Sequence, residues 1–199
     1  RSIYKKVIEI IEKFNLEYLN AGCKFLDVAC GTGEVICRLA SKYQQSKFYG
    51  IDFSKEMLEK ATSKVNHFNN ANITEGNIRN LNFSNNFFDI LLCSDAFHHF
   101  AEPEQSLKEM YRVIKVGGFL LFIDPAYDNF LQKFVLSTCV AVWDRPKKYY
   151  SRRELLNLLE IIGSKVQAVF TYRLTNFFIC HKLTSDSVIK AIKEKLVGN

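Results

Sequence analysis

A carboxylate and two glycines near the start of the chain form a pattern that can bind a nucleoside. Gly31 and Gly33 follow the apolar run 24–29, and Asp52 closes the next apolar run, nineteen positions after Gly33. Glycines let the backbone turn tightly and come close to a ligand, where a Cβ would clash. A carboxylate at the end of the second strand can accept hydrogen bonds from both hydroxyls of a ribose. The pattern therefore predicts a nucleoside cofactor.

The spacing of the glycines narrows the class of cofactor. A dinucleotide-binding loop has a third glycine three positions after the second, where the helix packs closely beneath a pyrophosphate. Here that position is Ile36, which disfavours a pyrophosphate. The lysine and the hydroxyl residue of a triphosphate-binding loop are missing as well. A nicotinamide oxidoreductase is therefore the weakest interpretation of this loop.

A second set of patterns carries a family resemblance. The run Asp27-x-Ala29-x-Gly31-x-Gly33 resembles motif I of the class I S-adenosylmethionine-dependent methyltransferases, usually written D/E-x-G-x-G-x-G. Four further stretches resemble later motifs of that family in the same order, so that the resemblance covers about residues 24–124. The branch that methylates small molecules, including the ubiquinone and menaquinone biosynthesis methyltransferases, is the most similar. The four later stretches are 50–57, 75–78, 87–94 and 112–121.

The resemblance implies a set of residues around S-adenosylmethionine, whose product is S-adenosylhomocysteine. The glycine loop would contact the methionine part, with Asp27 near its ammonium group, and Asp52 would hold the ribose. Aromatic and apolar side chains would sandwich the adenine, although Met57 fits ordinary helix packing equally well. The implied cofactor-binding residues are Asp27, Ala29, Gly31, Gly33, Asp52, Phe53, Met57, Asn77, Ile78 and Ser94.

Two of these positions depart from the family pattern. Ala29 replaces the first glycine, and an alanine is expected there only if the residue keeps a negative φ. Asn77 stands where many relatives have aspartate; its amide can still bond to an adenine edge, but with different donors and acceptors.

Two adjacent histidines are the candidates for acid–base chemistry. His98 and His99 come just after the fourth strand-like run, and an imidazole can take a proton at neutral pH. A methyl transfer needs such a base only when the acceptor must lose a proton. The alternative is that the pair shapes the turn before Pro103, and position alone does not rank the two rings. The histidines show no helical i, i+4 pair with a carboxylate, so no metal site is expected.

The surrounding pattern predicts the elements that position these residues. Strand-like and helix-like runs alternate up to about residue 124, which is typical of a parallel sheet covered on both faces. Two strand-like runs separated by two residues then predict an antiparallel hairpin. The expected fold is α/β, a Rossmann-like, seven-stranded, mostly parallel sheet with helices on both faces and a C-terminal antiparallel hairpin. The strands are expected at 24–29, 47–52, 71–75, 87–93, 118–124, 165–172 and 175–182, and the helices at 3–19, 34–44, 54–67, 103–115, 128–143, 155–162 and 185–197.

One domain is expected over residues 1–199. Its parts are an N-terminal helix or lid (1–22), a cofactor-binding core (24–124), a substrate-side insertion (125–150) and a C-terminal helix, hairpin and extra helix (151–199). The insertion is rich in aromatic residues, which can form a lid over an apolar or aromatic acceptor, or belong to the core or a dimer contact. These residues are Phe130, Phe134, Trp143, Tyr149 and Tyr150.

The composition of the chain indicates a cytoplasmic protein. No apolar run approaches the ~20 residues that span a bilayer, and we expect no signal peptide, although the chain begins at Arg1. The six cysteines form no C-x-x-C pair, which fits a reducing cytoplasm better than a disulfide framework.

The net charge of +6 raises the question of a nucleic-acid partner. The densest basic cluster is Arg145, Lys147, Lys148, Arg152 and Arg153, and a solvated loop and helix start is its simpler interpretation. The expected partner is therefore a small-molecule methyl acceptor rather than nucleic acid, with the oligomeric state left open. Two alternatives keep the cofactor: an RNA methyltransferase that uses the stretch 145–153, and a non-catalytic S-adenosylmethionine-binding protein.

Overall fold

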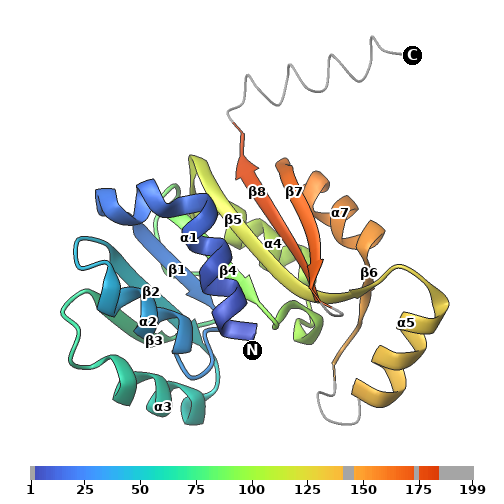
Figure 1. The fold of residues 1–199 in the computed structure, drawn as a ribbon, viewed down its shortest axis with the longest axis horizontal. Helices are drawn as coiled ribbons and strands as arrows, with labels where there is room; N and C mark the ends of the chain where they lie inside the picture. Colours follow the sequence, from blue (N-terminus) through green and yellow to red (C-terminus); the bar gives the residue numbers. More distant parts are fainter. Residues whose placement is uncertain (1–2, 141–145, 173–174, 184–199) are drawn as a thin grey trace.

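A computed structural model describes residues 3–140, 146–172 and 175–183 of the chain. One twisted sheet runs through it in the order β3-β2-β1-β4-β5-β8-β7, and a short strand, β6, pairs with β5 off this path (Figure 1). The strands are β1 (Lys24–Val28), β2 (Lys47–Asp52), β3 (Ala71–Glu75), β4 (Phe88–Ser94), β5 (Ile114–Tyr127), β6 (Tyr150–Ser151), β7 (Ser164–Tyr172) and β8 (Thr175–Lys182).

Helices connect and cover the strands. The longer ones each present apolar side chains on one stripe, which the sheet buries. They are α1 (Ile3–Ala21), α2 (Glu34–Lys42), α3 (Lys55–Val65), α4 (Pro103–Val113), α5 (Phe130–Val135) and α7 (Arg152–Ile161), with a 3-10 turn η1 (Phe97–His99) and a π-helical turn η2 (Leu136–Val140).

The direction of the strands creates the place for a ligand. Strands β1 to β5 pair in parallel, whereas β8 is antiparallel to both β5 and β7. Strand order reverses between β1 and β4, so the connections from these two strands leave toward opposite sides. Ligands of open α/β sheets bind at such a reversal, outside the carboxyl ends of the strands.

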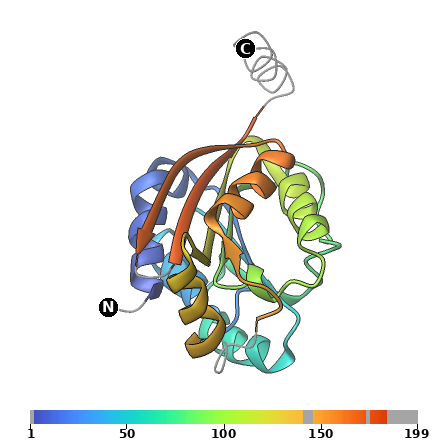
Figure 2. The same cartoon turned by 90° about the vertical axis from the view of Figure 1, so that its right-hand side faces the viewer.

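Helices cover both faces of the sheet, as the side view in Figure 2 shows, and two apolar layers pack them against it. One layer packs Val7 and Ile11 of α1, together with Leu39 of α2, against the sheet. The other packs Met110 of α4 and Leu155 of α7 against the opposite face. Strands that are buried on both faces have nearly continuous apolar sequences. The approximate ranges of these strands could therefore be predicted from the sequence.

The structure confirms the expected fold class, including the antiparallel hairpin of β7 and β8. Strand β5 is longer than the expected 118–124, because it extends in both directions to Ile114 and Tyr127. The two-residue strand β6 was not expected. The predicted helix 185–197 and the end of the predicted helix 128–143 lie outside the described residues. Within the described residues, no helix is both long and apolar enough to cross a membrane.

Candidate cofactor and acceptor site

The carboxylate of Asp52 ties together the loops that follow β1 and β2. Its Oδ2 accepts a hydrogen bond from the backbone N–H of Gly31 (2.8 Å), and its Oδ1 accepts one from Ser54 (2.9 Å). The side chain is 7% exposed. A carboxylate has about four acceptor positions, so two backbone donors leave capacity for the hydroxyls of a ribose. Asp52, at the end of β2, can therefore bind the cofactor and at the same time fix the glycine loop that follows β1.

The glycine loop leaves room for a ligand on one side only. Gly31 has φ +53°, and a Cβ placed there would meet nothing within 4 Å. Gly33 has φ +69°, and its Cβ would lie 3.0 Å from the Cβ of Ala61 on α3. Both residues therefore need the left-handed conformation that glycine adopts readily, and the open side of Gly31 suits the approach of the methionine part. The dinucleotide alternative is disfavoured, because the position of its third glycine holds Ile36. The side chain of Ile36 is fully buried and packs against Gly50.

Ala29 does not keep the negative φ that the sequence led us to expect. Its φ is +54°, in the left-handed region. The backbone must turn between the end of β1 and the N–H of Gly31, which Asp52 holds, and Ala29 adopts the glycine conformation of motif I despite its Cβ. The cost of this conformation for a non-glycine residue is about 1–2 kcal/mol.

Replacing Ala29 by glycine is expected to raise the free energy of unfolding by about 1 kcal/mol, because the strain exceeds the entropy that glycine adds to the unfolded chain. Urea denaturation of both proteins measures the difference. The matched control is Ala101→Gly at an exposed residue of negative φ, which should lower stability slightly. A destabilised Ala29→Gly protein would show that the left-handed conformation carries no strain.

Asp27 is a buried carboxyl group whose ionised form is disfavoured in the free protein. It is 4% exposed at the end of β1, and burial, together with the charge of Asp52, raises the pKa of Asp27 to about 8. An ammonium group beside it would reverse this effect by stabilising the ionised form. Asp27 therefore fits the role that the family resemblance implies for it.

Cofactor binding is expected to release about one proton near pH 6.5, because the free protein holds Asp27 mostly protonated and the bound ammonium would ionise it. The folded-state pKa of Asp27 is raised, so its contribution to stability is complete below about pH 4 and lost as the pH rises through about 8. Calorimetric titration with S-adenosylhomocysteine in buffers of different ionisation enthalpy counts the proton. Asp27→Asn should abolish the release, and an unchanged count in that variant would remove Asp27 from the site.

The adenine side of the site is exposed. The ring of Phe53 is 80% exposed, which excludes a core role and suits stacking on a flat base. Met57 is half-buried on the first turn of α3, and its N–H bonds to Ser54 Oγ at 3.4 Å. Ile78 packs at the edge of the apolar layer. Phe53 is thus a better candidate for base stacking than Met57.

Asn77 belongs to a loop that other residues fix in place. Gly76 N–H bonds to the backbone oxygen of Asp52 (3.0 Å), which places this loop beside the ribose carboxylate. Asn77 Oδ1 accepts hydrogen bonds from the backbone N–H (3.0 Å) and Nε (3.3 Å) of Arg79. Arg79 also forms an ion pair with Glu102 just before α4. Sequence reasoning missed Arg79 and Glu102, because neither belongs to a motif.

The loop after β4 brings further polar groups to the same edge. Ser94 ends β4 and is half-buried, and Asp95 has φ +54° with its N–H bonded to Ile123 (2.7 Å). Burial, followed by the carboxylates of Asp95, Glu34 and Asp27, raises the pKa of Tyr4. These carboxylates come from the loop after β4, the start of α2 and the end of β1, so the first turn of α1 lies near the carboxyl ends of the strands, as Figure 1 shows. Nothing in the sequence singled out Tyr4.

His98 and His99 have different environments. His98 is 1% exposed, and its Nδ1 lies 3.0 Å from Oδ1 of Asp124, which is fully buried at the end of β5. Phe97 N–H donates to the same oxygen (3.1 Å). His99 is exposed. Burial raises the pKa of Asp124, and the hydrogen bond with His98 opposes that rise. The two histidines thus differ in burial, and His98 has a buried carboxyl partner, Asp124, which no motif had marked.

A short segment covers His98. The backbone N–H groups of Lys147 (2.8 Å) and Lys148 (3.1 Å) both donate to the backbone oxygen of His98. The ring of Tyr149 stacks on the imidazole with 5.5 Å between centroids. Tyr150 is 5% exposed and packs on Phe97 at 5.2 Å. We call residues 147–150 the strap. Tyr150 belongs to the same apolar layer as Phe97, which is the core alternative for this residue, and the strap covers the His98 ring.

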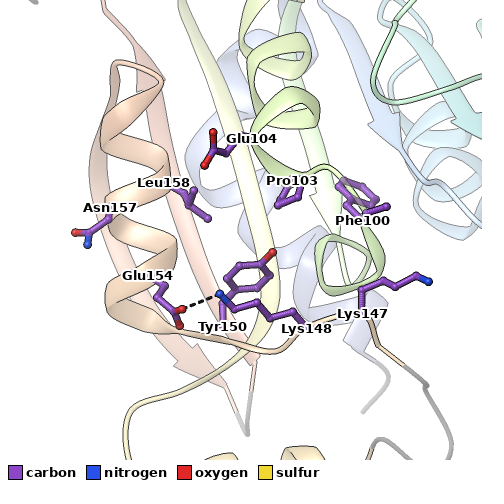
Figure 3. A pocket seen from close by; sticks show the side chains of 10 residues that line it. Phe100, Pro103, Glu104, Lys147, Lys148, Tyr150, Glu154, Asn157 and Leu158 are labelled. Atoms are coloured by element: carbon purple, nitrogen blue, oxygen red, sulfur yellow. Dashed lines mark hydrogen bonds and ion pairs between the residues drawn. The ribbon is translucent and has the colours of Figure 1, made fainter.

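A pocket lies on the outer side of the strap, with a volume of about 510 Å³. Figure 3 shows the Tyr150 ring and the side chains of Phe100, Pro103 and Leu158 around it. Lys148 reaches across it to Glu154, with 2.8 Å between Nζ and Oε1. Half of its lining residues are apolar or aromatic, and the other half are charged or polar: Glu104, Lys147, Lys148, Glu154 and Asn157.

The other residues predicted for the substrate-side insertion are either exposed or outside the described residues. Phe130 and Phe134 are exposed, so the alternative that they belong to the core is wrong. Trp143 and Arg145 lie outside the described residues. Within the basic cluster, Arg152 forms an ion pair with Asp128 at 2.8 Å, and Lys148 pairs with Glu154. Among the described residues, no group of three or more histidine, cysteine, aspartate or glutamate side chains could hold a metal ion.

Comparison with known proteins gives the family. Residues 26–122 match the profile described as a methyltransferase domain. This stretch of the chain is a methyltransferase domain of the class I, S-adenosylmethionine-dependent type. A similar protein, the demethylmenaquinone methyltransferase of Staphylococcus haemolyticus, is 31% identical over 143 residues, which cover 67% of this chain and 60% of the relative. The chain thus spans less than two thirds of that relative's length.

Solved structures show the same fold at low sequence identity. A SAM-dependent methyltransferase from Aquifex aeolicus is similar with a TM-score of 0.68 and 22% identity, covering 90% of this chain and 97% of that one. The [4+2]-cyclase SpnF has a TM-score of 0.76 and 15% identity, covering 90% and 82%. The cyclase shows that this fold alone does not determine the reaction.

The methyl donor of this family, S-adenosylmethionine, fits the site described above. The open side of Gly31, the buried carboxyl of Asp27 and the carboxylate of Asp52 lie where the methionine part, its ammonium group and the ribose would bind. When bound, the donor would supply a methyl group already activated on a sulfonium.

Proposed function

We propose that this protein transfers the methyl group of S-adenosylmethionine to a small aromatic acceptor that bears an ionisable hydroxyl. The observation that carries the proposal is the Asp52 carboxylate, which holds the glycine loop and the next loop together at the strand reversal. The ten residues that the family resemblance implies, Ser94 included, form the cofactor side in this proposal.

The acceptor is proposed to be a quinol of the demethylmenaquinone class. The support is the named activity of the relative from Staphylococcus haemolyticus and the aromatic and apolar half of the lining of the pocket beside the strap, which includes Phe100, Tyr150 and Leu158. Phe100 and Tyr150 offer ring surfaces to a planar acceptor. The pocket borders the strap that covers His98, so an acceptor that displaces the strap would meet the imidazole.

His98 is the proposed base, and His99 is not. A carboxylate accepts hydrogen bonds only, so Asp124 holds the proton of His98 on Nδ1 and leaves Nε2 as the basic atom. Nε2 would take the hydroxyl proton of the acceptor, and the electrons of the resulting phenolate would pass through the ring, so that the ring carbon next to the hydroxyl-bearing carbon forms the bond to the methyl carbon. The carbon–sulfur bond of the donor would break with its electrons going to sulfur, which would turn the sulfonium into a neutral thioether. The methylated ring carbon would then lose its hydrogen as a proton to water while Nε2 returns its proton to the oxygen, which restores the aromatic quinol.

The test is transfer of a labelled methyl group from S-adenosylmethionine to a water-soluble demethylated naphthoquinol. Turnover with the quinol, and none with the oxidised quinone, which lacks the hydroxyl proton, is the expected result. Tight cofactor binding without transfer to quinols or RNA would favour the non-catalytic alternative. Transfer to RNA alone, with binding that weakens steeply as salt rises, would favour the RNA methyltransferase.

The compartment is also a proposal. The cysteines of the described residues whose side chains are placed, Cys23, Cys30, Cys37, Cys93 and Cys180, are all free thiols. Free and partly buried thiols fit the reducing cytoplasm that the cysteine spacing predicted. Thiol titration of the protein after native extraction would test this proposal.

A further inference from the structure

Helix α5 exposes large apolar side chains. Phe130 is 82% exposed, Leu131 70% and Phe134 53%, and the helix has no buried residue. Phe134 lies at i+4 from Phe130 and at i+3 from Leu131, the spacings at which side chains are neighbours on a helix surface. These three side chains therefore form one apolar face, which we call the α5 face. The helix start is well defined, since Asn129 Oδ1 accepts a hydrogen bond from the N–H of Gln132 at 3.0 Å. The exposure therefore belongs to a formed helix.

The helix stands away from the two apolar layers of the fold. It follows the carboxyl end of β5 and packs against β5 and η2. Figure 1 shows α5 at the margin of the molecule, beyond β6. The core of this domain therefore does not need the apolar side chains of α5. Exposed apolar side chains that gather at one place mark an interaction surface.

The charges around the α5 face indicate the partner. Lys133 is exposed on α5 itself. Strand β6 pairs with the end of β5, and Arg152 bonds to Asp128, so the basic residues next to β6 border the root of α5. The described residues of 126–140 and 146–154 contain five basic side chains and two acidic ones, which leaves an excess of three positive charges. The basic residues are Lys133, Lys147, Lys148, Arg152 and Arg153, and the acidic ones are Asp128 and Glu154.

We propose that the α5 face docks this protein on an anionic lipid surface. Phenylalanine and leucine side chains would enter the boundary between headgroups and acyl chains, while the surrounding lysines and arginines contact acidic headgroups. A second copy of the chain is a poorer partner. A symmetric dimer would bring the same positive patch of both copies together, whereas an anionic membrane complements the apolar and the charged part at once.

The test is co-sedimentation of the full chain with vesicles. We expect binding to vesicles of phosphatidylcholine mixed with phosphatidylglycerol, and weak binding to phosphatidylcholine alone. The double substitution Phe130→Ser with Leu131→Ser should weaken binding by at least about tenfold, because it removes the side chains that would be buried in the bilayer. Lys133→Glu should weaken binding further only to the acidic vesicles.

The control is Val116→Ser, another exposed apolar residue, near the opposite end of β5. It should bind acidic vesicles as the unchanged protein does, and all variants should unfold at similar temperatures. No binding to acidic vesicles, or equal binding by the double variant, would overturn the proposal. A dimer in size-exclusion chromatography that Phe130→Ser separates into monomers would overturn it in favour of a second copy.

Discussion

Replacing Asp52 by alanine is expected to weaken binding of S-adenosylhomocysteine by about a hundredfold or more. The substitution removes the acceptor for the two ribose hydroxyls, and a hydrogen bond to a charged group contributes about 1.5–3 kcal/mol. It also leaves the N–H groups of Gly31 and Ser54 without the carboxylate that holds them. Both effects act on the same site, so Asp52 should be the most sensitive single residue for cofactor binding. Calorimetric titration measures the dissociation constant directly.

Two further variants separate the two roles of Asp52. Asp52→Asn keeps one acceptor oxygen for a backbone N–H but loses the charge, so its affinity should lie between those of the alanine variant and the unchanged protein. Glu56→Ala removes an exposed carboxylate a few residues along, on α3, and should leave affinity unchanged. An Asp52→Ala protein that is folded and binds with unchanged affinity would contradict the site described here.

Substitution of His98 by glutamine is expected to lower kcat by about a hundredfold to ten-thousandfold, the range typical of a lost general base. Asp124→Asn should also lower kcat, because an amide in place of the carboxylate no longer holds the proton on Nδ1 of His98. Affinity for S-adenosylhomocysteine should stay within about twofold in both variants, since neither residue belongs to the cofactor side. Turnover with the quinol acceptor and calorimetry together give the two measurements.

His99→Gln is the matched control, because it replaces the neighbouring exposed imidazole and should keep nearly full turnover. The pH dependence of kcat adds a readout that a structural role of His98 would not change. A base that must be neutral gives a rate that rises with pH through the pKa of the base, and this rise should disappear in His98→Gln. Full turnover in a folded His98→Gln protein would show that the His98–Asp124 pair only braces the strap.

Much of the fold could be predicted, since the buried strands and amphipathic helices leave periodic apolar patterns. Strand β2 lies exactly where the pattern from Lys47 to Asp52 placed it. The strap and β6 could not be predicted in this way. Tyr150 and Ser151 are too short a run to show a period, and their pairing with Ala126 and Tyr127 depends on a fold that is already formed.

For the candidate site, too, the residues within sequence motifs could be predicted and those outside the motifs could not. The residues of the motifs come from consecutive loops at one edge of the sheet, and their order along the chain already indicates a shared site. Asp124 and Tyr4 could not be found, because Asp124 lies beyond the last motif stretch, 112–121, and the helix of Tyr4 carries no motif. The conformation of Ala29 was predicted wrongly. The sequence shows an alanine, and the hydrogen bond between Asp52 and Gly31 that forces the turn exists only in the folded chain.

The measurement that most directly tests the cofactor assignment is a calorimetric titration of the unchanged protein with S-adenosylmethionine, S-adenosylhomocysteine and NADH in parallel. Our account predicts that the first two bind with micromolar or tighter dissociation constants and that NADH does not bind. The reason is that Ile36 occupies the place of the third glycine beneath a pyrophosphate. Binding of NADH without binding of either sulfur compound would contradict the account.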